Sequence, residues 1–395
     1  MGASVDTGQQ VIPCGVGHSH GAESEAAGRE AVRLALMGHR ATAEDLVIVF
    51  ADASYDIEAL YAAAVDEAAP AGVFGCSSTG CFTHAEQVAS GCVAALLAAD
   101  ERSFGICHVE RDESDIADSA RRAAQGARER AGDRHPHSVL LLLTDGLTPD
   151  QREIARGAYE VTTAVLPFVG GAAGDKLTWD RTSTFGDGKV LTNGIVAVWI
   201  NSAHAMGVSV DHGWRPAGKP MLVTRAEGTV VHELDGTPAL AAYIAEQGEE
   251  LEPTDSEFFR KVMKNPVGLP NARGRYDVRQ VHAYLPEGGG INFNTGISEQ
   301  SILQVMSTDD EALIEGARHA AADAVSQIEG KARLALVFSC GSRVPLLGAR
   351  LRDEVEAISS ALDGAPVCGF YTYGEFARTT GSSGVHNSSV AILAL

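Results

Sequence analysis

The chain has 395 residues, 45% hydrophobic and 6% aromatic, so it is long enough for two hydrophobic cores and too apolar for an intrinsically disordered protein. Its 52 Asp and Glu residues outnumber its 31 Lys and Arg residues, and the formal net charge of -21 disfavours nucleic acid and anionic membrane surfaces as partners. Because no run reaches the ~20 apolar residues that span a bilayer and residues 1–6 lack a signal-peptide pattern, we expect a cytoplasmic protein.

The N-terminal segment contains two histidines, His18 and His20, close to Cys14. One short segment supplies all three side chains, and no partner pattern elsewhere completes a tetrahedral metal site. We therefore predict no metal site and interpret the segment as a loop that caps a helix beginning at Ser24. The seven cysteines, odd in number and scattered, favour reduced thiols over disulfides.

The next segment combines a strand, a helix and a glycine-rich loop. Residues 46–51 (LVIVFA) form the short, continuous apolar run of a buried strand. Apolar residues then recur at helical spacing from Ile57 to Ala64, and Pro70 marks the end of that helix. Residues 73–82 (VFGCSSTGCF) predict a second strand that ends in glycines.

A second copy of this plan follows. Residues 140–143 form a strand, a helix is predicted from Pro149, and residues 167–175 (PFVGGAAGD) repeat the glycine-rich strand end. Strand patterns and a glycine turn come next, at 178–185, 186–188, 190–200 and 207–211. Because a hairpin adds antiparallel pairing, we expect mixed sheets.

The third copy closes the chain, with strand 334–338 (LALVF), a helix through Leu351 and Ile358, and residues 366–376 (PVCGFYTYGEF). Paired residues of the first and third copies align: Gly75 with Gly369, Gly80 with Gly374, and Phe82 with Phe376. Strand-helix-strand units are crossover units, and glycines at their ends allow close backbone approach, so these loops are candidate ligand contacts. The alternative is that the glycines only turn corners.

These patterns predict a mixed α/β (α+β) protein of two related domains, built from repeated strand-helix-strand units with mixed sheets. Sheets packed between helical layers fit the pattern, and a layered αββα arrangement is one such packing. A helix from Leu234 to Gly248 opens a new region, so we place the domains at 1–235 and 236–395.

The motifs, in their order along the chain, resemble the FIST sensory family, with its FIST N and FIST C domains. The residues that carry the resemblance are Gly17-His18-Ser19, 75–80 (GCSSTG), 144–146 (TDG), 170–175 (GGAAGD), Gly213-Trp214, 234–236 (LDG), Val278-Arg279, 338–340 (FSC), Arg343, 369–375 (GFYTYGE) and His386-Asn387. One departure is Cys81, where the family loop commonly carries an acid, as Asp175 and Glu375 do here.

This resemblance implies an intracellular sensor or ligand-binding signalling protein for a small molecule, with amino acids or similar polar metabolites as ligands. Some family members are haem-binding nitric oxide sensors that regulate a separate kinase or cyclase, and that function is an alternative. Any output of this chain would then pass through a separate signalling protein. The sequence does not identify an oligomeric state.

The candidate ligand-binding residues gather around the matched loops. The C-terminal loop offers Tyr371, Tyr373 and Glu375, whose hydroxyls and carboxylate suit a polar ligand; the alternative is that both tyrosines are core rings. The other candidates are Cys340, Arg343 as a clamp for a carboxylate, Arg279, His386, Asn387, Cys76, Ser77 and Asp175.

Haem remains open as a cofactor, with His386, His84 and His108 as candidate axial ligands. Without a CxxCH motif, any haem would be bound non-covalently. The phosphate-loop, nucleophile-elbow and HExxH signatures are missing from the sequence, which favours a non-enzymatic role. A hydrolase or transferase that uses Cys76 or Cys340 is the enzymatic alternative.

Overall fold

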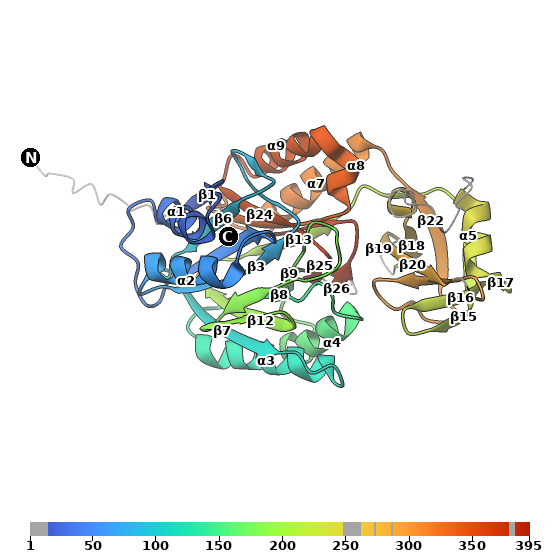
Figure 1. Cartoon of the computed structure of the whole chain (residues 1–395), viewed down its shortest axis with the longest axis horizontal. Helices are drawn as coiled ribbons and strands as arrows, with labels where there is room; N and C mark the ends of the chain where they lie inside the picture. Colours follow the sequence, from blue (N-terminus) through green and yellow to red (C-terminus); the bar gives the residue numbers. More distant parts are fainter. Residues whose placement is uncertain (1–14, 248–261, 272–273, 286, 379–383) are drawn as a thin grey trace, which may run out of the picture.

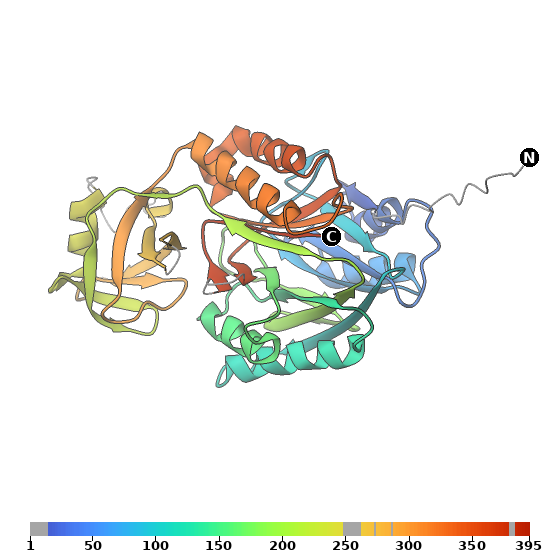
Figure 2. The same cartoon turned by 180° about the vertical axis from the view of Figure 1, so that it is seen from behind.

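The computed structural model describes residues 15–247, 262–271, 274–285, 287–378 and 384–395. These residues form a main body and a smaller lobe beside it (Figure 1). The main body consists of three units, and the lobe comprises the described residues between Arg215 and Ser307. Two chain segments join the lobe to the main body, one before β14 and one after β22 (Figure 2).

Each unit follows one order: strand, helix, strand, helix, strand, two short strands and a returning strand. Unit 1 contains β1 (Val16–Ser19), α1 (Ser24–Leu36), β2 (Leu46–Asp52), α2 (Ile57–Ala68), β3 (Gly72–Ser78), β4 (Cys81–Thr83), β5 (Gln87–Val88) and β6 (Cys92–Leu97). Unit 2 contains β7 (Arg102–Glu110), α3 (Ile116–Ala131), β8 (His137–Thr144), α4 (Gln151–Thr162), β9 (Phe168–Ala172), β10 (Thr184–Gly186), β11 (Lys189–Leu191) and β12 (Gly194–Ser202).

Unit 3 keeps this order, but the lobe is inserted after its first strand. The unit contains β13 (Gly207–Asp211), α7 (Asp310–Val325), β23 (Ala335–Cys340), α8 (Arg343–Leu347), a short 3₁₀ turn (Gly348–Arg350), α9 (Leu351–Ala361), β24 (Val367–Thr372), β25 (Glu375–Arg378), β26 (Gly384–His386) and β27 (Val390–Ala394). The lobe contains β14 (Arg215–Pro216), β15 (Met221–Glu227), β16 (Val230–Leu234), β17 (Thr237–Pro238), α5 (Ala239–Gln247), β18 (Val267–Pro270), β19 (Tyr276–Arg279), β20 (Val281–Leu285), β21 (Gly290–Phe293) and β22 (Ile302–Ser307).

The three units exchange strands in a ring. We call the two short strands of each unit its arm: β4–β5, β10–β11 and β25–β26. The arm of unit 1 pairs with β24 of unit 3, the arm of unit 2 pairs with β3 of unit 1, and the arm of unit 3 pairs with β9 of unit 2. Each arm joins antiparallel, whereas β2–β3, β8–β9 and β23–β24 are parallel pairs joined by a helix. Every sheet of the main body is therefore completed by another unit.

The sheets of the main body bury both faces. On β2, Ile48 and Phe50 face a central core formed by all three sheets, while Val47 and Val49 face α1 and α2. Helices α3 and α4 cover the outside of the second sheet, and α7 and α9 cover the third (Figure 1). The ring of Phe50 lies 4.4 Å from that of Phe370, which joins units 1 and 3. Truncating such a buried ring costs about 3–5 kcal/mol.

The predicted mixed α/β fold is confirmed, with sheets packed between helices. The expected strands at 46–51, 140–143, 207–211 and 334–338 and the helices from Ser24, Ile57 and Pro149 are present, with small shifts of their ends. Residues 178–183 do not form the expected strand, because they fold around Asp175 instead. The predicted domain boundary lies between β16 and β17 of the lobe and stays a prediction.

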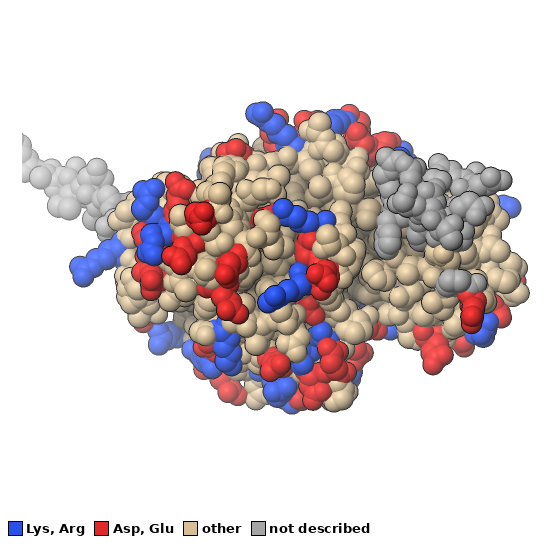
Figure 3. All heavy atoms as spheres, viewed as in Figure 1, with Lys and Arg blue, Asp and Glu red and all other residues tan. Residues whose placement is uncertain are grey.

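On the face shown in Figure 3, acidic and basic side chains are interspersed over the main body, whereas those visible on the lobe lie along its lower and outer edge. Among the described residues, no helix combines the length and the apolar character needed to cross a membrane.

Candidate functional site

The glycine-rich loops of the three units meet at the centre of the main body. We call Thr79-Gly80, Ala173-Gly174 and Tyr373-Gly374 the central loops. Backbone hydrogen bonds connect them: Thr79 N–H donates to Tyr371 C=O (3.2 Å), Gly174 N–H to Ser77 C=O (3.1 Å) and Tyr373 N–H to Ala172 C=O (3.0 Å). A Cβ on Gly174 would lie 2.3 Å from Thr79 Oγ1, so this approach requires glycine.

The residue after the second glycine is different in each unit, and its surroundings differ accordingly. Strand register makes Cys81, Asp175 and Glu375 equivalent positions. All three side chains are buried.

Asp175 is held by its own loop. The backbone N–H groups of Thr178 and Trp179 donate to Oδ1 at 3.1 and 3.0 Å, and those of Asp180 and Arg181 donate to Oδ2 at 2.6 and 2.8 Å. The Tyr373 hydroxyl also donates to Oδ1. Burial opposes ionisation, but these hydrogen bonds outweigh it and lower the pKa of Asp175. The Asp175 carboxylate therefore fixes the conformation of its own loop, whereas the sequence pattern predicts a ligand contact for this residue.

Glu375 has the opposite preference. Its side chain is fully buried, and it accepts hydrogen bonds from the hydroxyls of Thr372 and Ser389 and from Ser389 N–H. Burial raises the pKa of Glu375 to about 7, because these bonds compensate only part of the lost hydration. The group can therefore exchange its proton near neutral pH, which makes it sensitive to any charge that enters its surroundings.

A hydroxyl and thiol chain runs from Glu375 toward the lobe. The Cys340 thiol and the Glu375 carboxyl are close enough to influence each other electrostatically, and the Ser342 hydroxyl donates to Cys340 Sγ at 3.2 Å. Ser342 also lies 3.3 Å from the Ser388 hydroxyl, which donates to Gln280 Oε1 of the lobe at 2.9 Å. This chain connects the third central loop to the segment between β19 and β20.

Two buried amide side chains, those of Asn387 and Gln151, carry polar atoms that have no hydrogen-bond partner among the described residues. Asn387 is 1% exposed, and among the described residues neither its Nδ2 nor its Oδ1 has a hydrogen-bond partner. Gln151, 2% exposed, likewise has an unpartnered Oε1, and its amide lies where a Cβ of Gly374 would be. Asn387 is adjacent because His386 pairs with Glu375 across β25 and β26, and Ser389 binds the Glu375 carboxyl. Buried polar atoms without protein partners are rare, so these two amides are candidate hydrogen-bonding groups for a water or a ligand.

The lobe contacts the main body at the same place. The Trp179 ring stacks on Tyr373 with centroids 4.0 Å apart, and His282 of the lobe packs edge-on against Trp179 at 4.9 Å. The Arg152 guanidinium lies where a Cβ of the lobe residue Gly296 would be. The seam between the central loops and the lobe is therefore formed by aromatic rings and buried amides.

Three predicted residues lie away from this seam. Tyr371 packs on Phe82 with ring centroids 5.1 Å apart, and its hydroxyl accepts a hydrogen bond from Gln87 at 3.2 Å. Arg343 is fully buried; it donates to Glu354 at 2.7 Å and to backbone carbonyls of α7 and the β13–β14 connection. Cys76 belongs to the central core. The structure does not bring Tyr371 and Tyr373 to one face, because β24 ends between them.

His386 and Arg279 lie at the edge of the seam. His386 Nε2 lies 2.9 Å from the Ala377 carbonyl, and burial lowers the pKa of His386 to about 4. Arg279, on β19 of the lobe, donates to the carbonyl of Val385 at 3.3 Å, so it connects the lobe to β26. Ser77 donates to the carbonyl of Gly174 at 2.9 Å and thus joins two central loops.

The surroundings of the histidines and cysteines bear on the expected haem and thiol chemistry. Both ring nitrogens of His108 are engaged, with Gly186 C=O and the Thr184 hydroxyl, each at 3.0 Å. A haem iron would have to displace such bonds at His108 and at His386 Nε2. Burial raises the pKa of Cys340 to about 12 and raises that of Cys76 well above the normal thiol range. Both are therefore thiols at neutral pH, not the thiolates that nucleophilic catalysis uses.

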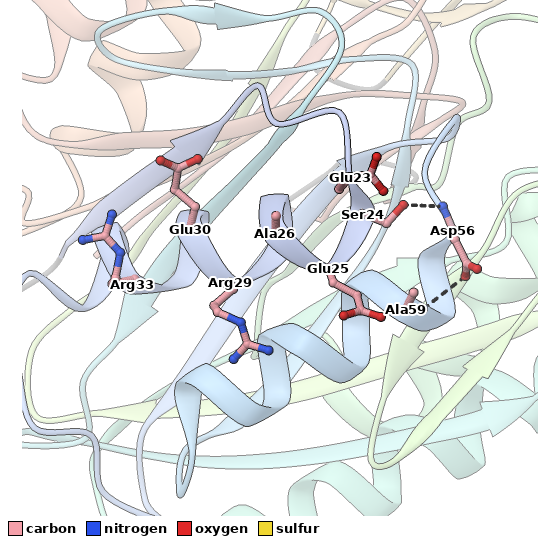
Figure 4. Close-up of a pocket in the computed structure, with 9 residues that line it drawn as sticks. All are labelled: Glu23, Ser24, Glu25, Ala26, Arg29, Glu30, Arg33, Asp56 and Ala59. Atoms are coloured by element: carbon pink, nitrogen blue, oxygen red, sulfur yellow. Dashed lines mark hydrogen bonds between the residues drawn. The ribbon is translucent and has the colours of Figure 1, made fainter.

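Several hollows lie on the outer surface. One of about 750 Å³ lies along α1 and the start of α2, where Glu25, Arg29 and Arg33 spread along the helix and do not converge on one point (Figure 4). Another, of about 340 Å³, is lined by Ser77 together with Tyr55 and Arg181. Of the candidate ligand-binding residues indicated by the sequence, Ser77 is the one that lines either of these two hollows.

Gln151, Trp179 and Glu86 were not among the residues that the sequence pattern indicated. Gln151 lies two residues after the predicted helix start at Pro149, and Trp179 lies in the strand that the sequence predicts over 178–185. No side-chain motif distinguishes them. For Gln151 the available signal is Gly374, which leaves room for the Gln151 amide.

Comparison with known proteins assigns the chain to a family. A model of the FIST N domain matches residues 45–237, and a model of the FIST C domain matches residues 239–378. An uncharacterized protein of Mycobacterium tuberculosis (strain H37Rv) is 27% identical over 267 residues, covering 66% of this chain and 68% of that protein. An uncharacterized protein of Methanocaldococcus jannaschii is 25% identical over 261 residues, or 62% of this chain and 50% of that protein.

Among solved structures, a cyanuric acid hydrolase from A. caulinodans aligns with 96% of this chain and 98% of its own, at 10% identity and a TM-score of 0.33. A likeness of that size carries no argument about chemistry.

Proposed function

Because the chain belongs to the FIST family, whose domains are small-ligand sensory domains, we propose that it is an intracellular sensor of a small polar metabolite, with amino acids as the first ligand class. The ligand binds at the seam between the central loops and the lobe. A separate signalling protein reads the result.

The observation that carries this proposal is the buried amide of Asn387. Leaving a buried donor or acceptor unpaired costs about 1–3 kcal/mol, and the described residues leave both atoms of this amide unpaired. A ligand that is both donor and acceptor removes that cost. An amino acid has both: its ammonium group donates to Oδ1, and its carboxylate accepts from Nδ2.

Glu375 and Gln151 extend the same chemistry. Glu375 lies next to the segment of Asn387, and near its pKa of about 7 it can ionise when an ammonium group approaches. The unpartnered Oε1 of Gln151 accepts a second donor. These groups favour a compact, polar ligand over an apolar one.

The lobe supplies a means of signalling. It is joined to the main body by two segments and contacts the seam through His282, Gln280 and Arg279. A ligand that contacts both the central loops and the lobe stabilises the arrangement in which the lobe lies close to the central loops, and so biases the position of the lobe. A partner that distinguishes the two positions would detect the ligand.

The test is a thermal-stability panel of the twenty amino acids on the full chain and on Asn387→Leu. We expect at least one amino acid to stabilise the wild type, by about 2.7 kcal/mol at a hundredfold excess over its Kd. Asn387→Leu should be as stable as the wild type without ligand, or more so, because it removes an unpaired amide of similar size. It should lose the ligand response.

The matched control is Asn193→Leu, which changes a partly exposed asparagine that donates to Glu110. This variant should keep the full response. The proposal fails if no amino acid stabilises the wild type, or if Asn387→Leu responds as the wild type does.

A further inference from the structure

The first unit brings three metal-binding side chains together outside the seam. Glu86 Oε2 lies 3.2 Å from His18 Nε2, and Glu86 Oε1 lies 3.2 Å from His20 Nε2. One ligand atom from each residue lies within 4.8 Å of the others. We propose that His18, His20 and Glu86 bind a divalent metal ion of the zinc class.

Strand geometry aligns the two histidines. His18 lies in β1, and His20 follows two positions later, so both side chains point to the same side of the chain. Their ring centroids are 5.5 Å apart. The chain around them is fixed, since the Ser19 hydroxyl donates to Glu30 at 2.6 Å and the Tyr55 hydroxyl donates to Gly21 C=O at 2.5 Å. The imidazoles are thus preorganised.

Glu86 comes from the turn of the unit 1 arm, between β4 and β5. Thr83 holds this turn: Thr83 N–H donates to Glu86 C=O at 2.8 Å, and Glu86 N–H donates to the Thr83 hydroxyl at 3.2 Å. The sequence offered only the histidines and Cys14, which lies outside the described residues. The third ligand is distant in sequence, and only the return of the arm brings it to β1.

Two imidazoles and one carboxylate form the set of three protein ligands typical of an open zinc site, whose fourth position is left to water or to another ligand. Other borderline ions such as Co²⁺ and Ni²⁺ fit the same donors. All three side chains are partly exposed, so an ion can exchange with solvent. Exposed His–Glu pairs contribute little to the free energy of folding. Metal binding therefore gives a better physical reason than folding stability for the proximity of His18, His20 and Glu86.

A bound ion would join β1 to the arm that unit 1 contributes to the third sheet. The next residue, Gln87, donates to the Tyr371 hydroxyl, and Tyr371 C=O accepts from Thr79 of a central loop. Metal occupancy would therefore fix the arm close to the centre of the body. This inference does not depend on the ligand proposed for the seam.

The test is equilibrium dialysis of the untagged full chain against Zn²⁺, with metal quantification, and titration with Co²⁺ followed by visible absorption. The variants are His20→Ala and Glu86→Gln. His204→Ala is the matched control, because His204 lies 3.1 Å from Glu101 as a similarly exposed pair without a second histidine.

We expect one ion per chain in the wild type and in His204→Ala. His20→Ala and Glu86→Gln should bind at least about tenfold more weakly, since loss of an outer-shell partner alone can have that effect. Their thermal unfolding without metal should match the wild type, because both positions are exposed. The inference is overturned if the wild type binds no Zn²⁺, if these two variants bind as tightly as the wild type, or if His204→Ala weakens binding equally.

Discussion

The loops after β9 and β24 occupy equivalent places in two units, yet they treat the same chemical group in opposite ways. Asp175 receives four backbone N–H groups from its own loop, and its pKa is lowered. Glu375 receives one backbone N–H group and two hydroxyls, and burial raises its pKa to about 7. Glu375 is also the more deeply buried of the two carboxyls, so the number of backbone donors and the depth of burial together decide whether each one is a fixed anion or a proton acceptor.

The two loops also have different consequences for the fold. The loop around Asp175 is long enough to wrap its N–H groups around the carboxylate and to place Trp179 on Tyr373. The loop after β24 turns directly into β25, so it has no N–H groups to spare for Glu375. Asp175 of unit 2 therefore stabilises its loop, whereas Glu375 of unit 3 can change its protonation state near neutral pH.

The largest effect is expected from Asp175→Ala. Removing the carboxylate leaves the N–H groups of residues 178–181 without their acceptor, and hydrogen bonds to charged groups contribute about 1.5–3 kcal/mol each, less than additively. We expect the free energy of unfolding to fall by about 4 kcal/mol in chemical denaturation at pH 7. Asp175→Asn should lose less, because its remaining amide oxygen accepts part of the set. A loss below about 1 kcal/mol for Asp175→Ala would contradict the anchoring role.

Glu375→Gln should show a pH-dependent effect. The pKa of Glu375 is about 7 in the folded chain, against 4.5 for an ordinary glutamate, so the folded state holds an extra proton between these values and stability falls as pH rises. At 1.36 kcal/mol per unit, the unfolding free energy of Glu375→Gln relative to the wild type should increase by about 3 kcal/mol from pH 4.5 to pH 7.

Measuring the difference between Glu375→Gln and the wild type also cancels His386. Its pKa is lowered to about 4 in the folded chain, so it adds stability as pH rises from 4 toward its unfolded value. This opposite trend is common to both proteins. A pH-independent difference would show that Glu375 is not the group that titrates.

Tyr373→Phe breaks the one side-chain bond that joins the two loops, from the Tyr373 hydroxyl to Asp175. The phenyl ring keeps the stacking on Trp179, so only the hydrogen bond is lost. We expect a loss of about 1–2 kcal/mol in unfolding free energy. The pKa of Asp175, followed by NMR, should rise toward its ordinary value, whereas a purely packing role would leave that pKa unchanged.

Cys81→Ser tests the third equivalent position and should have the smallest effect. The Cys81 thiol donates to Phe50 C=O at 3.3 Å, a bond that a hydroxyl can replace. We expect a change within about 1 kcal/mol in thermal unfolding, and no change in any amino-acid response. If the response disappeared, the first unit would have to contribute to the ligand site.

Local pattern predicted much of this architecture. The apolar runs at 46–51 and 334–338 are β2 and β23. Gly75 and Gly369 occupy equivalent places in β3 and β24, and Gly80 and Gly374 follow these strands. A run of apolar residues indicates a buried strand, and a glycine indicates a close approach between two backbone segments, so both features could be predicted from the sequence.

Which strand each arm pairs with could not be predicted from the sequence in this way. β4 has three residues, and nothing in Cys81–Thr83 specifies pairing with Val367–Thr372. For the site, motif matching named Glu375, Asn387 and Asp175, but their roles depend on the direction of backbone N–H groups, which no side-chain pattern encodes.

The ring of exchanged arms has a consequence for how the chain is made. During synthesis, β3 can be completed once Thr184–Gly186 has emerged from the ribosome, but β4 must wait for Val367–Thr372 near the C-terminus. Until then the first-made arm has no strand to join, so a nascent chain stalled before unit 3 exposes an edge that invites another chain. The first arm therefore acquires its native neighbour only after residues 367–372 have been synthesised.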